Sequence, residues 1–145
     1  MIQRLPRWSA AVVGVVVALG LSGLMSLAAA SDTTPLSGTT WELSGWNSPD
    51  PIDTITGQPI TLEVESGQVS GFAGCNRYFG PVDLGPSMIA LGPNLATTMM
   101  ACADPVARSE SSYLALLVSA DGWALSGNQL TLSAGGQMVL TFTRV

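Results

Sequence analysis

The chain of 145 residues contains no histidine. A Ser-His-Asp or Cys-His catalytic unit therefore cannot be built, because both rely on an imidazole as the base. Zinc and copper sites that use histidine ligands are excluded for the same reason. No side chain of ordinary pKa titrates near neutral pH, so acid–base chemistry there would need a large environmental shift.

Positive charge is also scarce. Two of the five basic residues, Arg4 and Arg7, lie at the N-terminus, and the chain has no lysine. From Ser31 onward three arginines stand against ten acidic residues, a net charge of −7. Such a surface repels phosphate backbones, which argues against nucleic-acid binding. Anionic membrane surfaces are poor partners for the same reason.

The N-terminal segment has the features of an export signal. Two arginines precede an uncharged apolar run over residues 9–30, and Ala28–Ala30 before Ser31 resembles a signal cleavage site. The run is long enough to span a bilayer, so an uncleaved signal anchor is the alternative. We expect residues 1–30 to be a signal, 31–35 a short tether and 36–145 one domain. The protein is then exported, periplasmic or extracellular, and membrane-bound only through residues 1–30 if they are retained.

Beyond the tether, short alternating segments separated by Gly, Pro, Asn and Asp predict strands. Strands are expected at 39–46, 60–66, 69–74, 130–134 and 138–145, in "YFGPVDL" and "MIAL", and in the β-prone run 96–102. One helix is expected at about 104–120, with Asp104 as its N-cap and Pro105 at its first position. The predicted fold is mainly β (α+β): a small, partly closed antiparallel barrel of seven to nine strands with one helix.

Cys75 and Cys102 are the only cysteines. In an exported protein an even pair suggests one structural disulfide, and the alternative is two buried thiols that act as small apolar residues. A redox-active role is disfavoured because the chain has no Cys-x-x-Cys motif and only Arg77 as a basic neighbour.

The segment "SGFAGCNRYFGP" (70–81) predicts a sharply bent strand. Its glycines permit positive φ or close strand approach, Asn76 tolerates the left-handed region, and Pro81 is expected to stop the strand. The functional alternative is a ligand loop with Arg77 as an anion contact. More simply, Arg77 is a surface residue or the ion-pair partner of an acid such as Asp104 or Glu110.

Three residue types could suggest a site and are interpreted as structural instead. The methionines Met88, Met99, Met100 and Met138 are expected to fill the core rather than bind copper. Trp41, Trp46 and Trp123 are expected in the core or at strand edges rather than on a sugar-binding platform. Asp50 and Asp53 match no calcium loop, and no two carboxylates are spaced to indicate a hydrolase.

Several motifs in order resemble the META domain family, which includes the HslJ-like heat-inducible envelope proteins. They are "LSGTTWELSGW" (36–46), "GCNRYFG" (74–80), "ATTMMACADP" (96–105), Glu110, "YLALL" (113–117), Trp123 and "GNQLTL" (127–132). The resemblance implies a mostly β fold with one helix, and a likeness to small lipid-binding pilot proteins with a cracked barrel. Many bacterial members are lipoproteins, but here Ser31 stands where a lipid-bearing cysteine could be.

The resemblance implies structural roles for its recurrent residues, and these would act beside the Cys75–Cys102 pair: Gly74, Asn76, Arg77, Met100, Asp104 and Glu110. It implies no catalytic residue, no metal and no cofactor. We therefore expect a non-catalytic exported protein that supports envelope stress or novobiocin-type antibiotic tolerance by binding an envelope protein or a small apolar ligand. The alternatives are an apolar-ligand or lipid carrier and, less favoured, a carboxylate-based hydrolase.

Overall fold

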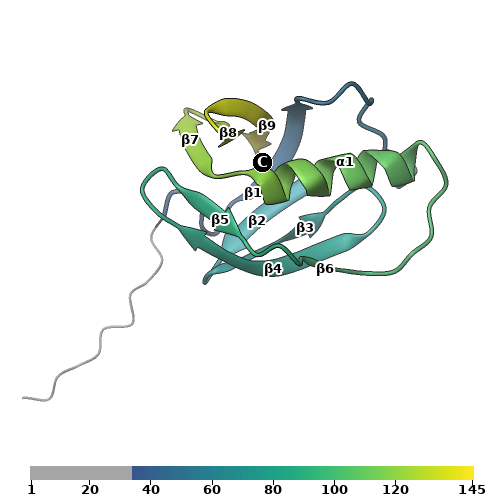
Figure 1. Cartoon of the computed structure of the whole chain (residues 1–145), viewed down its shortest axis with the longest axis horizontal. Coiled ribbons are helices and arrows are strands. Elements are labelled where there is room, and N and C mark those ends of the chain that lie inside the picture. Colours follow the sequence, from purple (N-terminus) through teal and green to yellow (C-terminus); the bar gives the residue numbers. More distant parts are fainter. Residues whose placement is uncertain (1–33) are drawn as a thin grey trace, which may run out of the picture.

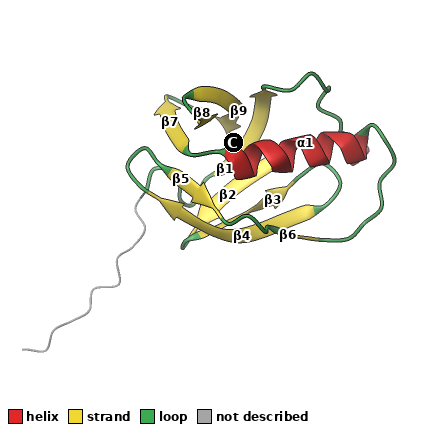
Figure 2. Cartoon of the chain, viewed as in Figure 1, coloured by secondary structure: helices red, strands yellow, loops and turns green. Residues whose placement is uncertain are grey.

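The computed structural model describes residues 34–145. The predicted signal and most of the predicted tether lie outside the described residues. The strands are β1 (Thr40–Trp46), β2 (Thr61–Glu65), β3 (Gln68–Phe72), β4 (Arg77–Leu84), β5 (Ile89–Leu91), β6 (Ala96–Thr97), β7 (Gly122–Ser126), β8 (Gln129–Ala134) and β9 (Gln137–Arg144). The helix α1 spans Val106–Ser119, and a single 3-10 turn spans Ile55–Gly57 (Figures 1 and 2).

The strands form one antiparallel sheet that nearly closes on itself. Its order is β5-β4-β3-β2-β1-β9-β8-β7, and β6 pairs with β4 beside β5. The two ends of this order meet where Met88 bridges Gly122. On either side of that bridge the Ile89 N–H donates to the Asp121 carbonyl (3.2 Å), and the Trp123 N–H donates to the Ser87 carbonyl (3.0 Å). The predicted fold class, a partly closed barrel with one helix, is confirmed.

The helix lies across the sheet and closes the core (Figure 1). Alternation in β2 places Leu62 and Val64 inside, as the sequence pattern predicts, and Tyr113 and Leu117 project from the buried face of α1. Burying a leucine or valine side chain stabilises the fold by about 1.5–3 kcal/mol. None of the helices within residues 34–145 has the length and apolar character that a membrane span requires.

Pro81 does not stop its strand, contrary to the prediction, because it occupies a gap in the ladder. The Pro81 carbonyl accepts a hydrogen bond from Gly92, so the backbone polar atoms of Pro81 face the β5–β6 side of β4. On that side β6 pairs with Tyr78 and Phe79, and β5 pairs only from Val82 onward. A proline at this point therefore removes no ladder hydrogen bond.

The methionine prediction is wrong: Met88, Met99, Met100 and Met138 are all exposed. Met138 should share the inner face with Leu140 and Phe142 by alternation. A bulge opposite Leu132 and Ser133 inserts Val139, which turns inward, and this turns Met138 to the outside. The sequence pattern also does not predict β7, which pairs with β8 in a hairpin.

The predicted strand over 96–102 is mostly wrong as well. Only Ala96 and Thr97 pair with β4. The Thr98 N–H still donates to the Arg77 carbonyl (3.0 Å), and the chain leaves the sheet from Met99 onward. The Asn76 side chain, rather than a neighbouring strand, forms hydrogen bonds with the Met100 backbone in this segment.

Candidate functional site

Glu110 of α1 lies at the centre of a polar cluster that joins three separate segments. Its Oε2 accepts hydrogen bonds from the backbone N–H groups of Cys75 (3.0 Å) and Asn76. Its Oε1 accepts one from the side-chain amide of Asn76 (2.8 Å). One carboxylate thereby fixes the helix to the turn between β3 and β4.

Asn76 extends the cluster to the segment that follows β6. Its Oδ1 accepts from the Met100 N–H (2.7 Å) and the Thr98 hydroxyl (2.9 Å), and its Nδ2 donates to the Met100 carbonyl (3.1 Å). The Asn76 amide therefore pairs with both backbone polar groups of Met100, as a strand neighbour would. This competition explains why the β-prone run around Met100 leaves the sheet.

A disulfide between Cys75 and Cys102 closes the same region, as the sequence predicted. The two Cα atoms are 6.3 Å apart, within the usual range for a disulfide, and the cysteines are 27 residues apart in the chain. On the chain-entropy model a loop of this length stabilises the fold by about 3.5 kcal/mol. We name the group Cys75, Asn76, Met100, Cys102 and Glu110 the clamp.

The turn that presents the clamp depends on Gly74. Its φ is +115°, a region that L side chains rarely adopt, and its carbonyl accepts a hydrogen bond from the Ile55 N–H (2.8 Å). The sequence analysis noted that Asn76 tolerates the left-handed region, but Asn76 does not adopt it. The non-glycine residues with positive φ in the described chain are Thr56 and Ser66. The site uses the Asn76 side chain together with its backbone N–H, which donates to the Glu110 carboxylate.

The predicted ion pair of Arg77 is absent. Within residues 34–145 the one ion pair joins Arg108 to Asp104 (3.3 Å), and both side chains are exposed. Arg77 is exposed, and its backbone N–H donates to the Thr98 hydroxyl (3.1 Å). Asp104 is not the N-cap, because the capping position is Pro105 and no side chain caps the helix. The exposed pair contributes little to stability.

A buried pair of tyrosines, which the sequence analysis missed, lies between the helix and the sheet. The Tyr78 and Tyr113 hydroxyls are hydrogen-bonded to each other at 2.8 Å, and they lie 2.9 and 3.4 Å from the Thr61 carbonyl oxygen. Because each phenol has one proton, one hydroxyl donates to the other and the second donates to this carbonyl. Burial raises the pKa of Tyr78 and the pKa of Tyr113 above the ordinary value of 10.0, and the neighbouring phenol raises that of Tyr113 further.

Gly71 leaves the space that the tyrosine pair needs. A Cβ at Gly71 would collide with the Thr61 carbonyl and would come within 2.8 Å of the Tyr78 hydroxyl oxygen. The available signals were that the chain has only two tyrosines and that Tyr113 lies on the apolar face of the expected helix.

The acidic residues Asp50 and Asp53 lie in the loop between β1 and β2. The Asp50 carboxylate accepts from the Ser112 hydroxyl (3.1 Å), and the Asp53 N–H donates to the Ser109 hydroxyl (3.0 Å). Both contacts attach this loop to α1. Among residues 34–145, no three His, Cys, Asp or Glu residues are grouped as metal ligands would be.

The tryptophans occupy the core and strand ends, as predicted. Trp41 is fully buried. Trp46 and Trp123 are half-buried, and their indole N–H groups donate to the carbonyls of Asp50 and Gly85, each at 3.0 Å.

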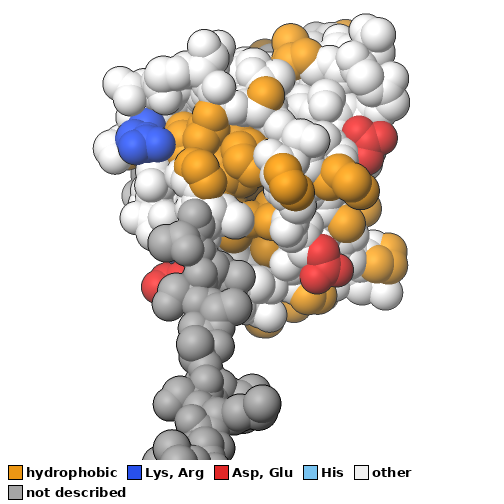
Figure 3. All heavy atoms as spheres, turned by 90° about the vertical axis from the view of Figure 1, so that its left-hand side faces the viewer, with side chains coloured by type: hydrophobic (Ala, Val, Ile, Leu, Met, Phe, Trp, Pro, Cys, Tyr) orange, Lys and Arg blue, Asp and Glu red, His pale blue; other side chains and the backbone are white. Residues whose placement is uncertain are grey.

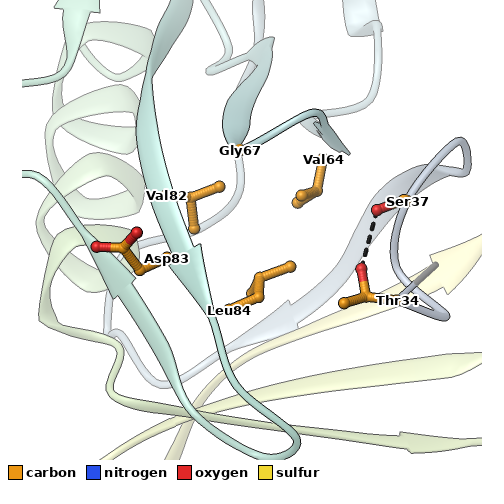
Figure 4. Close-up of a pocket in the computed structure, with 7 residues that line it drawn as sticks. All are labelled: Thr34, Ser37, Val64, Gly67, Val82, Asp83 and Leu84. Atoms are coloured by element: carbon orange, nitrogen blue, oxygen red, sulfur yellow. Dashed lines mark hydrogen bonds between the residues drawn. The ribbon is translucent and has the colours of Figure 1, made fainter. Parts of the chain in front are cut away.

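Two hollows lie at the opposite end of β4 from the clamp. One, of about 200 Å³, is lined by Thr34, Ser37, Val64, Gly67, Val82, Asp83 and Leu84. Figure 4 shows the Val82 and Leu84 side chains directed into it and the Asp83 carboxylate directed away. The other, of about 400 Å³ and mostly apolar, is lined by Thr34, Pro35, Leu84, Gly85, Pro86 and Trp123. We name the lining of this second hollow the exit face, because the described chain begins there.

Comparison with known proteins agrees with this architecture. The family model described as META domain matches residues 34–145. An NMR structure of a protein from Burkholderia xenovorans is 33% identical, with a TM-score of 0.61, over 76% of this chain and 83% of that one. A second NMR structure, 24% identical with a TM-score of 0.56 over 74% of this chain and 90% of that one, shares the fold. A search of curated proteins gave no match. By the family match across all of the described residues, this chain belongs to the META domain family.

Proposed function

We propose that this protein is a non-catalytic, exported META domain that supports tolerance of envelope stress, including novobiocin-type antibiotics, by binding another molecule. Its family membership and its disulfide support the proposal, since structural disulfides persist in oxidising compartments outside the cytosol.

The observation that carries the non-catalytic part is the engagement of Glu110. Its Oε2 accepts hydrogen bonds from the backbone N–H groups of Cys75 and Asn76, and its Oε1 accepts one from the Asn76 side chain. The Asn76 amide also forms hydrogen bonds with the Met100 backbone. A general acid or base must be free to exchange a proton with a substrate. In this cluster the same atoms hold the helix, the β3–β4 turn and the segment after β6 together, so we assign them a structural role.

Turnover assays on peptidoglycan and glycans test this part of the proposal. We expect no product from the wild type and none from Glu110→Gln. Turnover by the wild type that is lost in a folded Glu110→Gln variant would show that the carboxylate is catalytic.

The physiological part is tested in a strain that lacks the gene. We expect increased sensitivity to heat and to novobiocin, restored by the full chain and not by a chain that lacks residues 1–30. Normal growth of the deletion strain under both stresses would remove the stress role, and rescue by the leaderless chain would remove the need for export.

An apolar-ligand carrier is the second candidate, and the hollow at the exit face favours it. Its volume of about 400 Å³ lies within the range of small-molecule sites. The interior between α1 and the sheet is filled by the rings of Tyr78, Tyr113 and Phe142, so a ligand would have to lie at the surface. Native mass spectrometry after mild extraction separates the candidates: a stoichiometric lipid adduct supports the carrier, and its absence counts against it.

A further inference from the structure

The exit face is an apolar surface built where the barrel seam meets the start of the described chain. Pro35, Leu84, Pro86 and Trp123 line its hollow, and Trp123 is held there by its hydrogen bond to the Gly85 carbonyl (3.0 Å). Figure 3 shows hydrophobic side chains gathered on this side of the molecule. A contiguous apolar patch on an exported domain indicates a contact surface.

The position of the chain start limits what can cover this face. Thr34 lines both hollows, and its carbonyl and hydroxyl bond to Ser37, which fixes the start of the chain against the barrel. Residues 9–30 form the uncharged run of bilayer-spanning length, and only residues 31–33 separate it from Thr34. Even a fully extended connection reaches at most about 14 Å. If the run is in a membrane, the exit face is the part of the domain that must lie nearest to the lipid.

The negative charge of the domain disfavours lipids with anionic headgroups. The chain from Ser31 onward carries a net charge of −7, and the one charged residue that lines the neighbouring hollow is Asp83, whose carboxylate points away from it (Figure 4). Anionic headgroups would be repelled, whereas a half-buried tryptophan is favoured at the boundary between headgroups and acyl chains.

We propose that the exit face rests on the surface of an electrically neutral bilayer while residues 9–30 are inserted in it, with Trp123 at the lipid boundary. This inference rests on the proposed export of the domain and on the signal-anchor alternative, in which residues 1–30 are retained. Membrane contact through this face would hold the clamp end, about 23 Å away along β4, toward the aqueous compartment.

Trp46 provides a matched control for Trp123. Both indoles are half-buried, and both donate to a backbone carbonyl at 3.0 Å. Trp46 lies at the far end of β1, about 20 Å along the strand from Thr40. The experiment uses the full chain, with residues 1–30 verified by intact mass, in a Trp8→Phe background. It is reconstituted into phosphatidylcholine vesicles whose acyl chains carry bromine, a fluorescence quencher.

We expect bromine to quench Trp123 and to leave Trp46 unaffected, so that Trp123→Phe abolishes the quenching and Trp46→Phe does not. Equal quenching of both indoles, or quenching of neither, would overturn the proposal. A Pro86→Glu variant sharpens the test, because it places a carboxylate on the exposed turn of the exit face, and Pro49→Glu adds the same charge to an exposed turn elsewhere.

Loss of quenching in Pro86→Glu, with Pro49→Glu unchanged, supports membrane contact. Unchanged quenching in Pro86→Glu contradicts it, since a charge at that position would have to enter the apolar layer. Export is measured separately by cell fractionation. A chain that is exported normally but shows no quenching refutes the contact and leaves the proposed function standing.

Discussion

The two ends of β4 are built on opposite principles. The strand begins at Arg77, directly after the clamp. There a disulfide and the Glu110 carboxylate join three segments, and the polar groups of these segments form hydrogen bonds with one another. At Leu84 the strand enters the exit face, where apolar side chains line hollows and the barrel closes through a single bridge and its flanking hydrogen bonds.

The contrast places the strong cross-links and the apolar hollows at opposite ends of one strand. A sheet that nearly closes must be joined somewhere, and here the strong cross-links are at one end while the weak seam is at the other. The clamp end can therefore hold the fold without exposing reactive groups. The exit end presents apolar surface beside the seam, where Met88 bridges Gly122.

The largest expected effect is removal of the disulfide. The double variant Cys75→Ser/Cys102→Ser should lose about 3.5 kcal/mol of unfolding free energy, because the unfolded chain regains the entropy of the closed loop. Urea unfolding of both proteins measures the loss, and the oxidised wild type should weigh two daltons less than its reduced form. Coincident unfolding curves would show that the cross-link is not what stabilises this end.

The next effect tests the polar half of the clamp. Asn76→Asp keeps the shape of the side chain but replaces its donor with an oxygen that faces the Glu110 carboxylate and the Met100 carbonyl. An uncompensated, largely buried charge should cost about 3 kcal/mol. The control is Asn94→Asp, at an exposed loop position, which should change the unfolding free energy little. Equal effects of both substitutions would contradict the assignment.

A third effect follows from the tyrosine pair beside the clamp. The folded-state pKa of both phenols is raised, so their stabilising effect is complete below pH 10 and is lost as the pH rises from 10 toward the folded value. Each phenol should remove about 1.4 kcal/mol per pH unit, or roughly 2.8 kcal/mol for the pair at pH 11.

The composition makes this alkaline transition easy to assign. The chain has no lysine, and Tyr78 and Tyr113 are its only tyrosines. Urea unfolding between pH 9 and pH 11 gives the slope, and Tyr78→Phe should halve it. A stability that stays flat through this range would mean that the phenols are not shielded from water.

Sequence patterns predicted the clamp end better than the exit end. Alternation in β2, the two cysteines and the helical spacing of Tyr113 and Leu117 were sufficient for the fold class, the disulfide and the helix. These features depend on local periodicity or on a count of residues. The bonds of Asn76 to Met100 and Glu110 join residues that are 24 and 34 positions away, so local periodicity could not reveal them.

The exit face was missed for a related reason. Leu84, Pro86 and Trp123 come together only because β5 meets β7, and that closure depends on the whole strand order. Met138 shows the same limit on a smaller scale, since one bulge reverses the face that alternation assigns to it. Alternation along a strand and amino-acid composition describe one strand at a time. The exit face and the position of Met138 depend instead on how strands that are distant in the sequence pair with each other.

The smallest expected effect is at the exit end itself. Pro86→Glu should change the unfolding free energy by no more than about 0.5 kcal/mol, because Pro86 is exposed on a turn outside the strands. Urea unfolding beside Asn76→Asp makes the comparison direct. A loss as large as that at the clamp would mean that the exit turn holds the barrel together. A negligible loss, combined with altered quenching in vesicles, would instead establish that this end serves contact and that the clamp end serves stability.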